Sequence, residues 1–245
     1  MSLLPLYDRS LLAHASRPAL EFDVAGGARR ELTFGELESR SNQLARAFRA
    51  RGLRKGDRMA FFLEQRIDVI DVWLAAVKLG LIVVPLNVLF RERELTHLLR
   101  DTEPAAVMTS CELARLIPRE FKVWDVDALN AEAAAQPTSR LAVAATADTP
   151  MALMFTSGTT GAPKAAVLTH GNFAANGLTA VTAWEVTAAD RYLAMLPLSH
   201  AHGLANGLHC WLFSGCHMRL TERFDRTKIA QWLEEYRPTL LLGVP

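Results

Sequence analysis

Apolar and polar positions along the chain follow two rhythms, one typical of amphipathic helices and one typical of short buried strands. Between residues 34 and 51, leucine and phenylalanine recur on one helical face. Thr33 and Glu36 precede them with capping-box spacing, and Gly52 is a residue typical of the position after a helix. This pattern predicts a helix over residues 34–51.

Short apolar runs alternate with helical patterns through most of the remaining chain. The expected strands cover residues 59–63, 81–85, 105–109, 151–155, 165–168, 192–196, 216–220 and 239–242. The further helices are expected over residues 67–80, 91–100, 172–183, 204–213 and 226–236. Strands that alternate with helices usually pair in parallel, with the helices on the faces of the sheet. The sequence therefore predicts an α/β fold with predominantly parallel sheets flanked by helices.

Residues 127–149 interrupt this alternation. The stretch is rich in alanine, with glutamine, proline, serine and threonine and no clean period, which is typical of a surface connection with one short helical turn. We expect a first α/β subdomain over residues 1–145 and a second over residues 146–245. The last apolar run stops at a turn, which is an unusual end for a domain, and we expect the chain to be truncated there.

The composition excludes several classes of protein. Half of the 245 residues are apolar, 22% are charged, and the formal net charge is +1. No basic run reaches the length of a polyanion-binding arm, and no apolar run reaches that of a membrane span, so neither nucleic acid nor a membrane is an expected partner. Cys111, Cys210 and Cys216 form no CxxC pair, which indicates free thiols in a reducing compartment. With no signal-peptide pattern at the start, a cytoplasmic location is expected.

The loop at residues 155–164 concentrates groups suited to phosphate binding. Its sequence, FTSGTTGAPK, holds four hydroxyl side chains, two glycines and a terminal lysine directly after an expected strand. Glycine lets backbone N–H groups approach an anion, hydroxyls add donors, and Lys164 adds a positive charge on a chain stiffened by Pro163. The spacing does not fit a P-loop, because Ala162 and Pro163 separate Gly161 from the lysine. A solvated linker is the usual interpretation of such clusters, but this one lies between two apolar runs.

The longer stretch of residues 155–170, FTSGTTGAPKAAVLTH, resembles the signature of the adenylate-forming superfamily of acyl-CoA synthetases, aryl-CoA ligases, luciferases and peptide-synthetase adenylation domains. Ala165 departs from the pattern, where glycine is usual, and we expect its methyl group to leave phosphate contacts intact. Residues 32–37, 56–60 and 84–87 also resemble structural landmarks of the family. The resemblance implies that the β- and γ-phosphates of ATP are held by Thr156, Ser157, Gly158, Thr159, Thr160, Gly161 and Lys164.

A second motif, LPLSHAHG over residues 196–203, resembles the next motif of the same superfamily. By this resemblance His200 lies near the acyl carboxylate and acts in catalysis together with Lys164, while His202 and Gly203 border the acyl pocket. Histidine titrates near neutrality and can orient a carboxylate or donate to developing charge. For His209 and His217 a role in packing is expected.

A zinc site is the competing interpretation of the histidines and cysteines in the carboxy-terminal third. It could be drawn from His200, His202, His209, Cys210 and Cys216, but their spacing matches no standard ligand pattern. We therefore expect no protein-held metal, and Mg²⁺ to arrive with ATP.

The resemblance implies an AMP-forming acid:CoA ligase that activates a carboxylic acid with ATP and then transfers the acyl group to coenzyme A. Small side chains around His200 resemble those of malonyl-CoA synthetases and indicate a short-chain or dicarboxylic acid such as malonate. Fatty-acid and aryl-acid ligases, carrier-protein-loading domains and a noncatalytic nucleotide-binding module remain open alternatives. Family members continue past residue 245 into further active-site segments and a carboxy-terminal domain, so the isolated chain is expected to be inactive.

Overall fold

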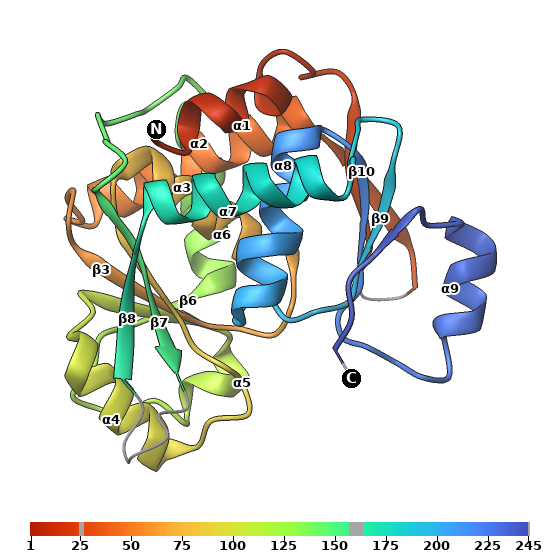
Figure 1. The fold of residues 1–245 in the computed structure, drawn as a ribbon. Helices are drawn as coiled ribbons and strands as arrows, with labels where there is room; N and C mark the ends of the chain where they lie inside the picture. The colour runs from red at the N-terminus through yellow and green to blue at the C-terminus, as the bar shows by residue number, and fades with distance from the viewer. Residues whose placement is uncertain (25–26, 157–163, 245) are drawn as a thin grey trace. The chain divides into compact units, whose positions relative to one another are not determined.

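The computed structural model describes residues 1–24, 27–156 and 164–244 (Figure 1). Contacts group the chain into two compact units. Unit 1 consists of Met1, Ser39–Glu64 and Asp68–Asn172, and unit 2 consists of Ser2–Glu38, Gln65–Ile67 and Phe173–Pro245. Each unit is built around its own sheet.

Unit 1 contains a six-stranded sheet in the order β6-β5-β3-β4-β7-β8. Its strands are β3 (Arg58–Phe62), β4 (Ile82–Pro85), β5 (Ala106–Thr109), β6 (Val123–Asp125), β7 (Pro150–Thr156) and β8 (Lys164–Thr169). β3 pairs in parallel with β4 and β5, β4 with β7, and β5 with β6, whereas β7 and β8 form an antiparallel hairpin. The buried strands are almost continuously apolar, as parallel strands covered on both faces usually are.

The helices of unit 1 pack by apolar and by polar contacts. They are α2 (Phe34–Ala50), which enters from unit 2, α3 (Ile67–Leu79), α4 (Glu92–Thr102), α5 (Cys111–Ala114) and α6 (Val126–Ala134). Leucines of α4 share one core with residues of three strands and of two loops: Ala60, Phe62, Val84, Leu86, Leu95, Leu98, Leu99, Val107 and Ile117. Between α2 and α3, the fully buried Lys78 donates to Ser41 Oγ and Asn42 Oδ1, both at 2.7 Å. Buried polar groups need such partners, so these bonds fix how the two helices pair.

Unit 2 contains a five-stranded sheet in the order β11-β9-β10-β1-β2. Its strands are β1 (Pro18–Asp23), β2 (Arg29–Thr33), β9 (Arg191–Ala194), β10 (His217–Leu220) and β11 (Leu240–Leu241). β10 pairs in parallel with both β1 and β9, and β11 pairs in parallel with β9, whereas β1 and β2 are antiparallel. The central pairing of this sheet therefore joins residues almost 200 positions apart in sequence.

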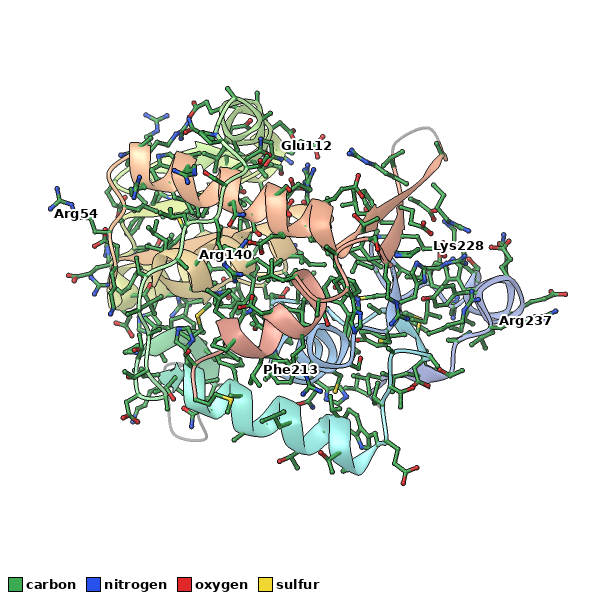
Figure 2. All side chains as sticks on the ribbon, turned by 90° about the horizontal axis from the view of Figure 1, so that it is seen from above. Arg54, Glu112, Arg140, Phe213, Lys228 and Arg237 are labelled. Atoms are coloured by element: carbon green, nitrogen blue, oxygen red, sulfur yellow. The ribbon has the colours of Figure 1, made fainter. Side chains whose placement is uncertain are left out.

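The helices of unit 2 are α1 (Leu4–Leu11), most of α7 (His170–Ala183), the π-helix η1 (His202–Leu208), α8 (His209–Ser214) and α9 (Ile229–Tyr236). α9 buries Trp232 and Tyr236 against β9. Figure 2 shows Phe213 on α8 in the space between α1 and α7, and its ring lies 5.7 Å from that of Tyr7. Ser10 of α1 donates to the Leu212 carbonyl of α8 at 2.7 Å. These contacts hold α8, and with it the end of the π-helix, in place.

The α/β class with mostly parallel pairing is confirmed, and each predicted strand and helix has a counterpart within a few residues. The predicted helix cap is also present, since Thr33 N donates to Glu36 Oε2 and Glu36 N donates to Thr33 Oγ1. The sequence pattern did not predict α1, β1, β2, α5 or β6. No helix in the described part of the chain combines the length and apolar character that crossing a membrane requires.

The contacts divide the chain along a different line from the expected boundary at residue 145. β7 pairs with β4 and adds a hairpin to the sheet of unit 1, so residues 150–169 belong with the preceding strands. The start of the chain instead places β1 beside β10 in unit 2. The expected boundary differs because strands far apart in the sequence pair with each other, and a local change in composition does not reveal such pairing.

Candidate functional site

The β7–β8 hairpin brings the two ends of the predicted phosphate loop together. Thr156 ends β7, Lys164 begins β8, and the two residues are direct partners in the antiparallel register. Directly opposed residues of an antiparallel pair place their side chains on the same face. The Thr156 hydroxyl lies 3.4 Å from the Lys164 carbonyl, and both side chains are exposed. A hydroxyl and an ammonium group are thus offered from one face, where an anionic phosphate could accept from both.

The predicted loop residues Ser157, Gly158, Thr159, Thr160 and Gly161 lie outside the described residues. The strand after the loop is described and differs from the expected buried apolar strand. β8 occupies the end of the sheet order, and Val167 is 57% exposed. The strand that follows the loop is therefore a solvent-facing edge of the sheet.

The end of the signature sequence begins helix α7. Thr169 and Asn172 form a reciprocal cap, because Thr169 N donates to Asn172 Oδ1 at 2.9 Å and Asn172 N donates to Thr169 Oγ1 at 3.2 Å. His170, the first helical residue, is completely buried. Burial, with a smaller contribution from the positive charge of Lys55, lowers the pKa of His170 to about 4. At neutral pH His170 is an uncharged part of the core.

The second motif begins where β9 ends, and the side chain of Gln65 holds this segment in place. Gln65 Nε2 donates to the Ala194 carbonyl at 3.1 Å and to the Thr221 carbonyl at 2.8 Å. Its Oε1 accepts from the Leu198 backbone N–H at 3.2 Å. One amide group thus connects the ends of β9 and β10 to the loop that carries His200.

The helix expected over residues 204–213 is present in two forms, a π-helix at residues 202–208 and an α-helix from His209. A π-helix is rare and is often found at functional sites. Two glycines allow its close packing. A Cβ on Gly203 would lie 2.4 Å from the Pro197 carbonyl oxygen, and one on Gly207 would lie 2.2 Å from the Tyr192 hydroxyl oxygen. Gly203 is therefore required by the backbone of the preceding loop, in addition to any role beside a substrate.

His200 and His202 differ in how they are held. The His200 side chain is exposed, while its backbone N–H donates to the Pro197 carbonyl at 3.1 Å and its carbonyl accepts from Leu204 N at 2.8 Å. His202 is partly exposed, and its Nδ1 lies 2.8 Å from Asn206 Nδ2. The imidazole of His202 is therefore oriented by a side chain of its own helix.

His209 has the packing role expected from the sequence. It is completely buried, its Nδ1 is 2.8 Å from the Leu204 carbonyl oxygen, and its Nε2 is 2.9 Å from the Tyr7 hydroxyl. The Phe173 ring stacks on it at 5.0 Å with an interplanar angle of 10°. Both ring nitrogens of His209 are thus used within the core.

A group of potential metal ligands occurs elsewhere in unit 2. Within the described ranges, Glu21, Glu31 and His217 are the one set of ligand-type side chains whose atoms lie within 4.8 Å of one another. Arg219 Nε already lies 2.5 Å from Glu21 Oε1, and His217 Nδ1 lies 2.9 Å from the Tyr236 hydroxyl. A cation at this place would have to displace an arginine, and we assign no metal to it.

All three cysteines are free thiols, as expected. Cys111 is exposed, whereas burial raises the pKa of Cys210 to about 12 and that of Cys216 to about 11. The two buried thiols therefore remain protonated near neutrality and are unsuited to nucleophilic catalysis.

Sequence reasoning identified the motif residues but not the residues that hold them. The structure places Thr156 and Lys164 together in unit 1, and it places His200, His202 and Gly203 together in unit 2. Gln65, Asn176 and Asn206 were missed. Only Asn206 carried a signal, because it follows His202 by four residues in a segment expected to be helical.

The fold and the two motifs define the class of protein. The apo crystal structure of MatB from Rhodopseudomonas palustris matches 100% of this chain and 50% of its own length, with 31% identity and a TM-score of 0.87. The ATP-bound structure of the same protein matches with a TM-score of 0.84. The fold is that of the N-terminal domain of adenylate-forming enzymes.

The chain belongs to the family of AMP-binding enzymes, whose family model matches residues 7–245. A feruloyl-CoA synthase from an Amycolatopsis species is 33% identical over 87% of this chain and 44% of its own length. A sulfoacetate–CoA ligase from Cupriavidus necator is 30% identical over the same shares of the two chains. The chain spans about half the length of the curated relatives it matches.

Proposed function

We propose that this chain serves the ATP-dependent activation of a carboxylic acid to an acyl-adenylate, followed by transfer of the acyl group to coenzyme A. The observation that carries the proposal is the hairpin that joins Thr156 and Lys164 around a hydroxyl-rich loop, in a chain whose family model covers residues 7–245. The CoA ligases among its relatives support the acceptor. ATP, Mg²⁺ that arrives with it, and coenzyme A are the proposed co-substrates.

In the first step a carboxylate oxygen attacks the α-phosphorus of ATP, the bond to the bridging oxygen breaks, and pyrophosphate leaves with the electron pair. The ammonium of Lys164 and the Thr156 hydroxyl bind the departing phosphates and offset the charge that accumulates there. His200 orients the carboxylate. In the second step the thiolate of coenzyme A attacks the acyl carbon and AMP leaves.

Calorimetric titration of the chain with ATP and with pyrophosphate tests the phosphate site. Loss of one charge-assisted hydrogen bond in Lys164→Ala should weaken pyrophosphate binding roughly tenfold or more. Lys228→Ala is the matched control, since Lys228 is another exposed lysine of the chain. Equal affinities of parent and Lys164→Ala, or equal losses in the two variants, would refute the assignment.

Turnover is tested by AMP release in the presence of an acid, ATP and coenzyme A. In a chain that turns over, Lys164→Ala should slow adenylation, measured by pyrophosphate exchange, much more than it slows acyl transfer from preformed acyl-AMP. Binding of ATP and pyrophosphate without AMP release from any acid, in the full-length protein as well as in the isolated chain, would favour a noncatalytic nucleotide-binding module instead.

For the acid, we propose a short-chain or dicarboxylic acid such as malonate. Ser199 and Ala201 on either side of His200 are small, and relatives named MatB and sulfoacetate–CoA ligase support a short substrate with a second polar group. The feruloyl-CoA synthase supports an aryl acid as the rival. A panel of malonate, a long-chain fatty acid and ferulate, each offered with coenzyme A or a carrier protein, separates these possibilities.

A further inference from the structure

Asn176, Asn206 and His202 form a chain of hydrogen bonds within unit 2. Asn176 lies on α7, and the other two lie on the π-helix. Asn176 Nδ2 lies 3.0 Å from the Ala205 carbonyl oxygen and 2.7 Å from Asn206 Oδ1. Asn206 Nδ2 lies 2.8 Å from His202 Nδ1.

The Ala205 carbonyl determines which atoms in this chain are donors. A carbonyl oxygen only accepts, so the Asn176 atom beside it must be the amide nitrogen. The Asn206 atom next to that nitrogen must be oxygen, because two amide N–H groups would repel each other. The amide nitrogen of Asn206 therefore faces His202 and donates to Nδ1. Since Nδ1 accepts, the proton of the neutral imidazole resides on Nε2.

We propose that Asn206, oriented by Asn176, is a positioning residue that fixes His202 as the Nε2–H tautomer, and that this N–H donates to an acceptor oxygen in the acyl part of the acid. The donation from His202 to the acid rests on the proposed function. It defines a substrate class: a carboxylic acid that carries a second carboxylate, a sulfonate, a hydroxyl or a carbonyl oxygen. A plain alkyl acid would leave a polar donor without a partner, and sites built to bond a polar group discriminate strongly against such analogues.

The exposure and the bonding of His202 suit this role. The side chain is partly exposed, and the bond from Asn206 is the one hydrogen bond of its ring within the described residues. His202 also follows His200 by two residues on the same segment.

His209 is an internal reference, because its Nδ1 lies beside an acceptor whereas Nδ1 of His202 lies beside a donor. Its Nδ1 lies 2.8 Å from the Leu204 carbonyl oxygen, which can only accept, so Nδ1 of His209 carries a proton. The two histidines lie seven residues apart and should differ at Nδ1 under the same conditions. A general effect of solvent or pH on imidazoles would not produce that difference.

Nitrogen NMR of the 245-residue chain labelled with ¹⁵N-histidine measures the tautomers directly. Resonances are assigned with the variants His202→Gln and His209→Gln. At neutral pH we expect His202 Nδ1 to show the shift of an unprotonated nitrogen and Nε2 that of a protonated one, with His209 Nδ1 protonated. A protonated Nδ1 in His202 of the parent chain would overturn the proposal.

Asn206→Asp tests whether Asn206 fixes the tautomer of His202. Its carboxylate still accepts from Asn176 but can only accept from His202, so Nδ1 should become protonated. Asn176→Ala should release the amide of Asn206 and give a mixture of tautomers. Asn172→Asp is the matched control, because the Asn172 side chain already accepts from Thr169 N and the change in charge is the same. An unchanged His202 spectrum in Asn206→Asp would overturn the positioning role.

Titration of the labelled chain with malonate and with propionate tests the substrate class, because propionate replaces one carboxylate of malonate by a methyl group. Malonate should shift the His202 Nε2 resonance and bind roughly tenfold more tightly than propionate, and Asn206→Asp should remove this preference. Absence of a malonate-dependent shift at His202 would refute the donor role. Failure of the proposed function shows itself separately, as absence of ATP and pyrophosphate binding in a chain whose His202 tautomer is as stated.

Discussion

Replacement of Gly203 by alanine tests the close packing of the π-helix against the loop before it. The added Cβ would lie 2.4 Å from the Pro197 oxygen, 2.8 Å from the Leu196 oxygen and 2.9 Å from the Pro197 carbonyl carbon. All three are backbone atoms, so no side chain can rotate away. The nearest pair must separate by about 1 Å to reach an ordinary contact. Gln65 resists that movement, because its Oε1 accepts from the N–H of the next residue in the loop.

The expected cost follows from two opposing effects. Overpacking in a close-packed region costs about 1–3 kcal/mol, and a clash with fixed backbone belongs at the upper end. Alanine has a better helix propensity than glycine by roughly 1 kcal/mol. The Gly203→Ala chain should therefore be less stable by about 2 kcal/mol, which for a chain of this size lowers Tm by about 4–8 °C.

Thermal and urea unfolding of Gly203→Ala, followed by circular dichroism, measures this loss. Gly243→Ala is the matched control in the same unit, because a Cβ there would meet nothing within 4 Å. The control should change stability by less than about 0.5 kcal/mol. A Gly203→Ala chain as stable as the parent, or stabilised by its better helix propensity, would show that the loop and the π-helix are not packed as described.

Three further substitutions probe the polar contacts within the units. Gln65→Leu should lower the free energy of unfolding by about 2 kcal/mol, because the Thr221 carbonyl and the Leu198 N–H lose their bonds to this side chain. Gln65→Glu should do no better, since a carboxylate cannot donate to the carbonyl. Urea unfolding of both variants measures the loss. Burial raises the pKa of Asp71 to about 6 against the opposing charge of Arg40. The contribution of Asp71 to stability is therefore full below the unfolded pKa near 4 and is lost as pH rises through about 6. Unfolding curves of Asp71→Asn measured between pH 4 and 7 should not show this loss. Burial lowers the pKa of His170 to about 4. The contribution of His170 to stability is therefore full above the unfolded pKa near 6.5 and is lost as pH falls toward 4. Unfolding curves of His170→Gln over the same pH range should not show this loss.

The pH dependences of Asp71 and His170 have opposite signs over the same range, and both residues belong to unit 1. In the parent chain they should partly cancel. Each single variant should therefore reveal the slope of the other: stability rising with pH in Asp71→Asn and falling with pH in His170→Gln. A pair of variants with the same slope as the parent would contradict both assignments.

The strands and helices that the sequence predicted share one property, a local pattern strong enough to read within a dozen residues. The apolar runs of β3, β4 and β5 and the spaced leucines of α2 are of this kind. β1 and β2 lack it, because much of their length stays exposed and they are stabilised by pairing with each other and with β10. The α/β class was predicted correctly although β1 and β2 were missed, because the local alternation of strands and helices is sufficient to define it.

The candidate site was predictable to the extent that chemistry is carried by residue type. A lysine after a run of hydroxyls and glycines predicts an anion site, and this stays a prediction. The structure adds that Thr156 and Lys164 lie opposite each other. The π-helix could not be predicted, because residues 202–208 have the same apolar spacing as an α-helix and differ in what the glycines approach. The amide of Gln65 acts across 133 residues of sequence, and no local pattern reports such a contact.

The two units interleave along the polypeptide, and this order affects how the protein is made. The chain leaves unit 2 after Glu38, returns briefly at Gln65–Ile67 and returns for good at Phe173. The ribosome therefore synthesises every strand of the unit 1 sheet before it reaches β10, the strand that pairs with β1 in unit 2. The β1–β2 ribbon must wait through some 180 residues of synthesis, on the order of ten seconds or more at common elongation rates. Chaperone binding during translation should accordingly concentrate on the first forty residues.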